Sequence, residues 1–299
     1  MRAVLCFSLL LAGGPGRAAA GAPSFSMFDS PVFAVVNPRV GTRLSRAAFE
    51  DAVSGARVVY AGEVGGSARS QLARLEILDM MVKARGRVAV GLEMVPSGSQ
   101  RLLDGYLAGR IPEKEFLSGS AWSGQAAFTP YKPLFVYIRE HKLKVLALDL
   151  PRGLPAKLAQ GGIASLDRGE RAMLPQDIRM NADKPYLAYL KRSFYAGSAA
   201  KRTEWENYLF SISAWNAALA ARIICFLGEN PDYSLLVLTG NGRIMYNAGV
   251  PARIKSAVPG ISQVSVYVSG AAAPGKPAEI APPPADYIWF TGGSGMAAW

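Results

Sequence analysis

Short apolar runs alternate with amphipathic segments along most of the chain. Five runs are predicted as strands; they lie at residues 57–63, 87–94, 145–150, 234–239 and 261–269. The first is rich in β-branched and aromatic residues and ends near a glycine, which is the pattern of a buried strand. Between the first two runs, apolar residues recur at helical spacing after Ser67, and Gly86 ends the pattern. Strands that alternate with helices predict an α/β fold, with a mainly parallel sheet and helices on both of its faces.

The section from about residue 152 to residue 230 interrupts this alternation. It is mostly helical in pattern, and we interpret it as a helical insertion or subdomain. Its clearest helix, at 204–227, is apolar on all sides and is followed by Gly228, which predicts a position at the centre of the fold. Shorter helices are expected near 97–108 and 130–141, and residues 286–291 are expected to return as an edge strand.

The first twenty residues have the pattern of a cleavable export signal. A positive start at Arg2 is followed by an apolar run at 3–12, and Ala18-Ala19-Ala20 offers the small residues that a signal peptidase reads. The run is well short of the roughly 20 residues that a membrane helix needs. Cys6 lies inside the run and no cysteine stands at the cleavage position, so no lipid anchor is predicted.

This pattern predicts a signal peptide at 1–20, one α/β domain at 21–270, and a linker with a C-terminal tail at 271–299, rich in proline, alanine and glycine. The start of the domain, at 21–47, is mixed in pattern and is expected to be irregular at first. The expected location is the periplasm or the medium, in soluble form. No later segment reaches about 18 uninterrupted apolar residues, so no transmembrane span is predicted in the mature chain.

The charge balance is strongly basic, with a net charge of +11. Arg2 and Arg17 are the only charged residues of the predicted signal, so cleavage leaves the chain basic. This balance favours an anionic partner such as a lipid, a polyanion or a small acid, whereas the even spread of lysine and arginine argues against nucleic acid. Cleavage would leave Cys225 as the single cysteine, which cannot form an internal disulfide and is expected to be buried on the apolar helix.

Polar residues gather where the predicted strands end. Glu63, Glu93 and Asp149 each stand at a strand end, and Thr239 to Arg243 follows the fourth strand. Ligands of open α/β sheets bind beyond the carboxyl ends of the strands, so these residues predict a polar cleft. The alternative for each acid is a structural pair with an arginine, because an unpaired buried carboxylate is costly.

Other common sites find little support. The glycines at 62–66 do not form the dinucleotide-binding motif, and the chain has a single histidine, His141, at a predicted helix end. A zinc site and a serine-histidine-aspartate triad are therefore not expected.

Read together, the strand-end motifs form an ordered series. It comprises VVYAGEVG at 58–65, VAVGLEM at 88–94, LAGRI at 107–111, YKPL at 131–134, KVLALDLPRGL at 144–154 and LLVLTGNGRIMYNAGVPARI at 235–254. The series resembles the ChaN-like haem-binding uptake proteins of bacteria, in the same order over most of residues 55–255. The resemblance implies an α/β fold, export to the cell envelope and a role in haem or iron acquisition. It also implies haem held by a tyrosine across a homodimer interface, and an outer-membrane haem receptor as a partner.

The resemblance also suggests which residues hold the haem. Tyrosine oxygen is a known ligand of haem iron, and Tyr131 and Tyr106 lie in matching motifs, so either is a candidate iron ligand. Arg243 suits a propionate, because its guanidinium matches a carboxylate. The remaining candidates of the haem site are Lys132, Tyr246, Glu63 and Glu93. Each tyrosine has the alternative of being a core residue with a bonded hydroxyl.

Two departures from the family pattern keep other functions open. The family commonly has histidine where this chain has Gly65 and Arg243, and distant relatives of the erythromycin-esterase type use those histidines in metal-dependent hydrolysis. The main hypothesis is a non-enzymatic haem-binding protein. The alternatives are a degenerate hydrolase that uses Glu63 and Glu93, or an interaction scaffold with an apolar C-terminal segment.

Overall fold

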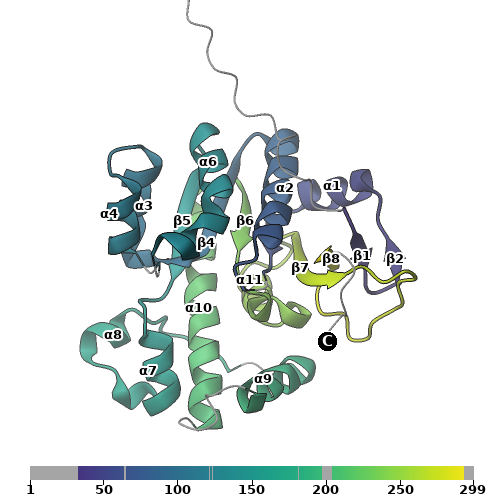
Figure 1. The fold of residues 1–299 in the computed structure, drawn as a ribbon. Coiled ribbons are helices and arrows are strands. Elements are labelled where there is room, and N and C mark those ends of the chain that lie inside the picture. Colours follow the sequence, from purple (N-terminus) through teal and green to yellow (C-terminus); the bar gives the residue numbers. More distant parts are fainter. Residues whose placement is uncertain are drawn as a thin grey trace, which may run out of the picture. The chain divides into compact units, whose positions relative to one another are not determined.

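The strands of the described chain form one eight-stranded sheet, in the order β2-β1-β8-β7-β3-β6-β4-β5 (Figure 1). The computed structural model describes residues 33–292 except residues 64, 121, 123, 181 and 197–203, so the predicted signal at 1–20 lies outside the described residues. The strands are β1 (Val35–Asn37), β2 (Thr42–Arg43), β3 (Val58–Ala61), β4 (Val88–Pro96), β5 (Lys144–Asp149), β6 (Ser234–Leu238), β7 (Gln263–Ala272) and β8 (Tyr287–Gly292). Neighbours from β8 to β5 pair in parallel, and β1 pairs antiparallel with β8 and β2. The mainly parallel sheet is confirmed.

Helices bury both faces of the central strands. Successive strand residues point to opposite faces, and the two core clusters divide accordingly. Val59 and Leu236 belong to the cluster that contains α1 and α2 residues, whereas Val58 and Leu235 pack with α10 residues such as Ile223. The helices are α1 (Arg46–Gly55), α2 (Ala68–Arg85), α3 (Gln100–Leu107), α4 (Glu113–Gly119), α5 (Gln125–Phe128), α6 (Lys132–Glu140), α7 (Leu154–Gly161), α8 (Arg168–Ala172), α9 (Lys184–Ala196), α10 (Trp205–Glu229) and α11 (Val250–Ala257).

The helical section predicted at 152–230 is present as α7 to α10. Its longest member, α10, contacts β5, α7, α9 and α11, which confirms the central position expected for it. Among the described residues α10 is the helix with the length and hydropathy of a membrane span, but 56% of that window is buried inside the fold. This burial is what a core helix of a sheet protein shows.

The described part of the start at 21–47 contains β1 and β2. Two expectations are wrong in detail. The segment at 286–291 was expected at a sheet edge, but β8 lies between β7 and β1, with Trp289 buried; β1 covers the side that would otherwise be open. The sheet therefore continues to Gly292. Cys225 is exposed rather than buried, because it lies on the outer side of α10.

Candidate functional site

Four neighbouring strands, β3, β6, β4 and β5, bring their polar carboxyl ends to one edge of the sheet. Glu63 follows β3, Glu93 lies within β4, Asp149 ends β5, and Thr239 follows β6. A short 3-10 turn, Asn241–Arg243, comes directly after β6 and places Arg243 beside these acids. The structure thus contains the polar cluster that the strand-end motifs predicted, and it divides into two groups around two arginines.

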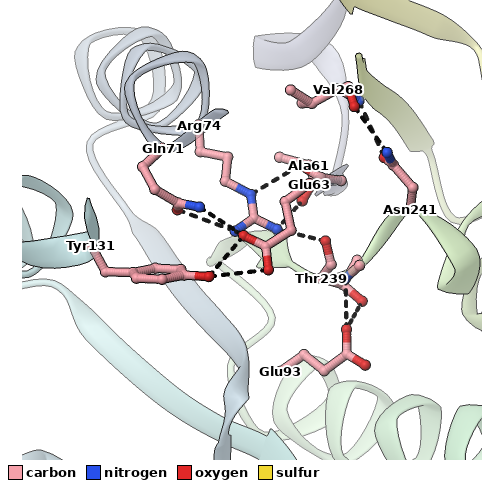
Figure 2. Close-up of polar contacts among 11 residues, drawn as sticks. Ala61, Glu63, Gln71, Arg74, Glu93, Tyr131, Thr239, Asn241 and Val268 are labelled. Carbon is pink, nitrogen blue, oxygen red and sulfur yellow. Dashed lines mark hydrogen bonds and ion pairs between the residues drawn. The ribbon is translucent and has the colours of Figure 1, made fainter. Parts of the chain in front are cut away.

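The first group is centred on Arg74, which α2 directs toward the ends of β3 and β6 (Figure 2). Its side chain is fully buried, and its Nη1 lies 2.7 Å from Oε2 of Glu63. Its other nitrogens donate to the carbonyls of Gly62 at 3.0 Å, Ala61 at 3.1 Å and Thr239 at 2.5 Å. Arg74 therefore ties two strand ends together. Burial lowers its pKa, and the charge of Glu63 opposes that shift.

Glu63 is fully engaged in this group. It accepts from Gln71 at 2.7 Å, from Arg74 at 2.7 Å and from the hydroxyl of Tyr131 at 3.0 Å. Tyr131 is buried and packs edge-on to Trp122, with 4.7 Å between ring centroids. Burial first, and then the charge of Glu63, raises the pKa of the Tyr131 hydroxyl far above its ordinary value. Two predicted site residues, Glu63 and Tyr131, are thus brought together by a hydrogen bond.

Tyr106 and Lys132 meet elsewhere, around Glu113. The Tyr106 hydroxyl donates to Glu113 at 3.3 Å, and Lys132 pairs with Glu113 at 2.9 Å. The ring of Tyr106 stacks on Phe116 with 4.7 Å between centroids. Burial and Glu113 raise the pKa of Tyr106 to about 12. These two predicted residues therefore lie within the helices α3 to α6.

The second group is centred on Glu93 and Arg243. Nε of Arg243 donates to Oε1 of Glu93 at 2.8 Å, and Oε2 accepts from the Gly240 amide at 2.8 Å and from the Thr239 hydroxyl. Burial alone would raise the pKa of Glu93, but Arg243 and these hydrogen bonds hold it below its ordinary value. Glu93 is therefore an ionised partner of Arg243.

Trp215 of α10 links Arg243 to the end of β5. The Arg243 guanidinium lies 3.5 Å from the centroid of the Trp215 ring, and the indole Nε1 donates to Asp149 at 2.6 Å. Burial, and then the nearby charge of Glu93, raises the pKa of Asp149 to about 7. The chain of contacts from Glu93 to Asp149 thus contains one acid that titrates near neutral pH.

A cavity of about 210 Å³ opens beside Glu93 and Arg243, and three tyrosines line it. Tyr186 is fully bonded, since its hydroxyl donates to the Gly242 carbonyl at 2.9 Å and accepts from Asn216 at 3.1 Å. Tyr189 of α9 and Tyr208 of α10 are half-buried, and their hydroxyls have no hydrogen-bond partner among the residues that the structure describes. The cavity therefore offers two phenol oxygens next to a cation.

Sequence reasoning missed these three tyrosines. They come from α9 and α10, and none lies in a strand-end motif. The usable signal was the spacing of Tyr186 and Tyr189, which puts both on one side of a helix. Tyr246, which the motifs did single out, lies in a second 3-10 turn at Met245–Asn247 and packs against the same aromatic cluster without lining this cavity.

The comparisons with known proteins agree on the fold. A family model described as haem-binding uptake, Tiki superfamily, ChaN matches residues 49–254. A structure of cofacial haem binding to ChaN of Campylobacter jejuni superposes with a TM-score of 0.64 at 17% identity, covering 87% of this chain and 97% of that chain. At this identity the likeness shows a shared fold.

Two further solved structures are more distant. A mutant of the erythromycin esterase EreC has a TM-score of 0.48 at 15% identity, covering 80% of this chain and 77% of that one. The type III effector HopBA1 has a TM-score of 0.46 at 13% identity, covering 87% and 100%. No curated protein matches the sequence.

Proposed function

This chain belongs to the ChaN family of haem-binding uptake proteins, and from that premise we propose that it binds haem as cargo in haem or iron acquisition. The proposal includes export, for which the support is the signal-peptide pattern of residues 1–20. Outside the inner membrane the protein would meet haem before it enters the cell.

The observation that carries the proposal is the pair of unbonded phenols, Tyr189 and Tyr208, in the cavity beside Arg243. A tyrosine oxygen is a suitable ligand for haem iron. A phenol hydroxyl without an internal partner can lose its proton and bind iron without breaking a hydrogen bond inside the protein. The donors of the cavity suit the iron and a propionate of haem, but a volume of about 210 Å³ is too small for the whole macrocycle. We therefore propose Tyr189 or Tyr208 as the source of the iron ligand for a haem that lies at the mouth of this cavity.

The tyrosines singled out by the sequence motifs are less available. Tyr131 donates to Glu63, and Tyr106 donates to Glu113, so each would have to leave a carboxylate partner and an aromatic cluster. Both remain predictions that the same experiment tests. The cations proposed near the propionates are Arg243, which lines the cavity, and Arg192, which is exposed three residues after Tyr189 on α9.

We propose a binding role rather than hydrolysis. Glu63 and Glu93, the acids that a hydrolase would use, each pair with an arginine and accept further hydrogen bonds. Arg243 and its hydrogen bonds hold the pKa of Glu93 below its ordinary value, which makes this carboxylate a weak base, and the carboxylate of Glu63 is occupied by its bound donors.

A haemin titration of single-site variants tests the proposal. We expect a saturable Soret shift in the wild-type protein, and loss of most of it in the double variant Tyr189→Phe with Tyr208→Phe. Tyr131→Phe and Tyr106→Phe should keep it. Tyr195→Phe is the matched control, because this tyrosine is on the same helix but is 63% exposed and does not line the cavity. Absence of any saturable shift in the wild type would overturn the proposal.

A further inference from the structure

A larger groove lies away from the strand ends, along the open side of β5. β5 is the last strand in the sheet order, and it contacts both α3 and α10 (Figure 1). The groove has a volume of about 1010 Å³ and is bounded by the end of α3, by residues 143–147 and by α10. None of the residues proposed for haem lines it.

Two walls of the groove are a helix face and a strand. On one side, α10 contributes Arg222, Cys225, Phe226 and Glu229, which share one helix face over about 10 Å at a rise of 1.5 Å per residue. On the other side, Leu143 to Ala147 runs for roughly 13 Å at strand spacing. Apolar side chains from both sides, including Leu146 and Phe226, line the space between them. An extended alkyl chain of medium length matches the lengths of these two walls.

The edge of β5 is already closed to another strand. The Gln100 carboxamide donates from Nε2 to the Val145 carbonyl at 3.0 Å and accepts from the Ala147 amide at 2.7 Å. These are the two hydrogen bonds that an added strand would make first. A peptide that pairs with β5 would have to displace Gln100, so the groove favours a ligand that needs no backbone pairing.

The charge of the groove selects an anion. Its cationic side chains outnumber its acids, which are Asp104 and Glu229; the cations are Arg110, Arg139, Lys142, Lys144 and Arg222. Arg222 is half-buried and has no ion pair or hydrogen bond with any described residue. Its burial lowers its pKa, which means that the charged form is poorly solvated where it stands. A bound carboxylate would compensate that charge.

We propose that this groove binds a medium-chain fatty acid, with the apolar tail between β5 and α10 and the carboxylate on Arg222. The site is independent of the proposed haem cavity. The protein would then have a second class of ligand, the amphipathic monocarboxylates. Such molecules are common near membranes.

Displacement of a fluorescent fatty acid by dodecanoate tests this proposal. We expect saturable binding to the wild-type chain, displacement by dodecanoate, and no displacement by dodecylamine, which has the same tail and the opposite charge. Arg222→Gln should weaken binding about tenfold, since it removes one charge-assisted hydrogen bond. Arg168→Gln is the control, because Arg168 is exposed on α8 and outside the groove. Equal displacement by the amine, or unchanged affinity in Arg222→Gln, would overturn the proposal.

Cys225 supplies a second measurement that does not depend on the folding of a variant at Arg222. Its exposed thiol lines the groove and donates to Glu229 at 3.4 Å, an interaction that raises its pKa and slows its reactions. In a chain with Cys6→Ser, dodecanoate should slow maleimide labelling of Cys225, and dodecylamine should not. Haemin serves as a separate arm: protection by haemin at equal potency would show a porphyrin site and contradict a fatty-acid site. Labelling that is indifferent to dodecanoate would also contradict it.

Discussion

At the scale of single residues, two arginines organise the strand ends in different ways. Arg74 is fully buried and bonded to Glu63 and three carbonyls, so it holds β3 and β6 together. Arg243 is sandwiched between Glu93 and Trp215 at the wall of a cavity. The first arrangement is typical of a structural anchor, whereas the second leaves a cation beside space for a ligand.

Removal of the Arg74 charge should be strongly destabilising. Arg74→Met leaves Glu63 without its cation and the Gly62 and Thr239 carbonyls without a donor, whereas the Ala61 carbonyl keeps the Thr239 amide. We expect a loss of about 3 to 5 kcal/mol in the free energy of unfolding. Lys83→Met is the comparison, because the exposed pair of Lys83 with Asp79 is worth at most about 0.5 kcal/mol. Urea denaturation of both variants checks this. Similar losses for the two would show that Arg74 is not an anchor.

Asp149 should make stability depend on pH. Its pKa rises from 3.8 to about 7 on folding, so its contribution to stability is full below about pH 4 and is lost as the pH rises through 7. The shift corresponds to about 4 kcal/mol between those limits. The substitution Asp149→Asn keeps an acceptor for Trp215 without a charge, so it should flatten this part of the profile. The test is the free energy of unfolding of the wild type and of Asp149→Asn, measured at pH 5 and at pH 8. An equal change between the two pH values in both proteins would refute this role of Asp149.

At the scale of elements, the sequence was informative where strands are buried on both faces. β3, β4 and β6 were predictable because parallel strands that are buried on both faces are largely apolar runs. β5, the last strand, and β7 are only partly buried, and they were found from shorter runs of strand-forming residues. β1 and β2 were not, since elements of two or three residues carry no periodicity. β8 was predicted as a strand, but its place inside the sheet depends on pairing with β1. The local sequence pattern does not show that pairing. The strand-end acids were predictable for the same reason as the strands, whereas Tyr189 and Tyr208 depend on how α9 and α10 pack.

At the same scale, the Gln100 side chain covers part of the open edge of β5 with two hydrogen bonds. Gln100→Ala should cost about 1 to 2 kcal/mol in the free energy of unfolding, because the partly buried Val145 carbonyl and the Ala147 amide of the edge strand lose their partners. It should also increase self-association, since an open strand edge pairs with other chains. Arg101→Ala, an exposed neighbour on α3, is the control. Denaturation and sedimentation together measure both effects, and a monomer of unchanged stability would contradict this role.

At the scale of the whole molecule, one buried apolar helix, α10, contributes residues to both proposed binding sites. α10 supplies Trp215 under Arg243, Tyr208 in the cavity and Arg222 in the β5 groove. Its hydropathy comes from this central position, because both the sheet and α7 pack against it. The basic charge of the chain, +11 overall, suits the anionic groups of both proposed ligands.

The most direct measurement is the electron paramagnetic resonance spectrum of haem-loaded protein, taken for the wild type and for the variant with Tyr189→Phe and Tyr208→Phe. We predict a high-spin ferric signal typical of tyrosinate ligation in the wild type and its loss in the double variant. A tyrosinate signal that persists in the double variant and disappears in Tyr131→Phe would contradict the cavity as the haem site.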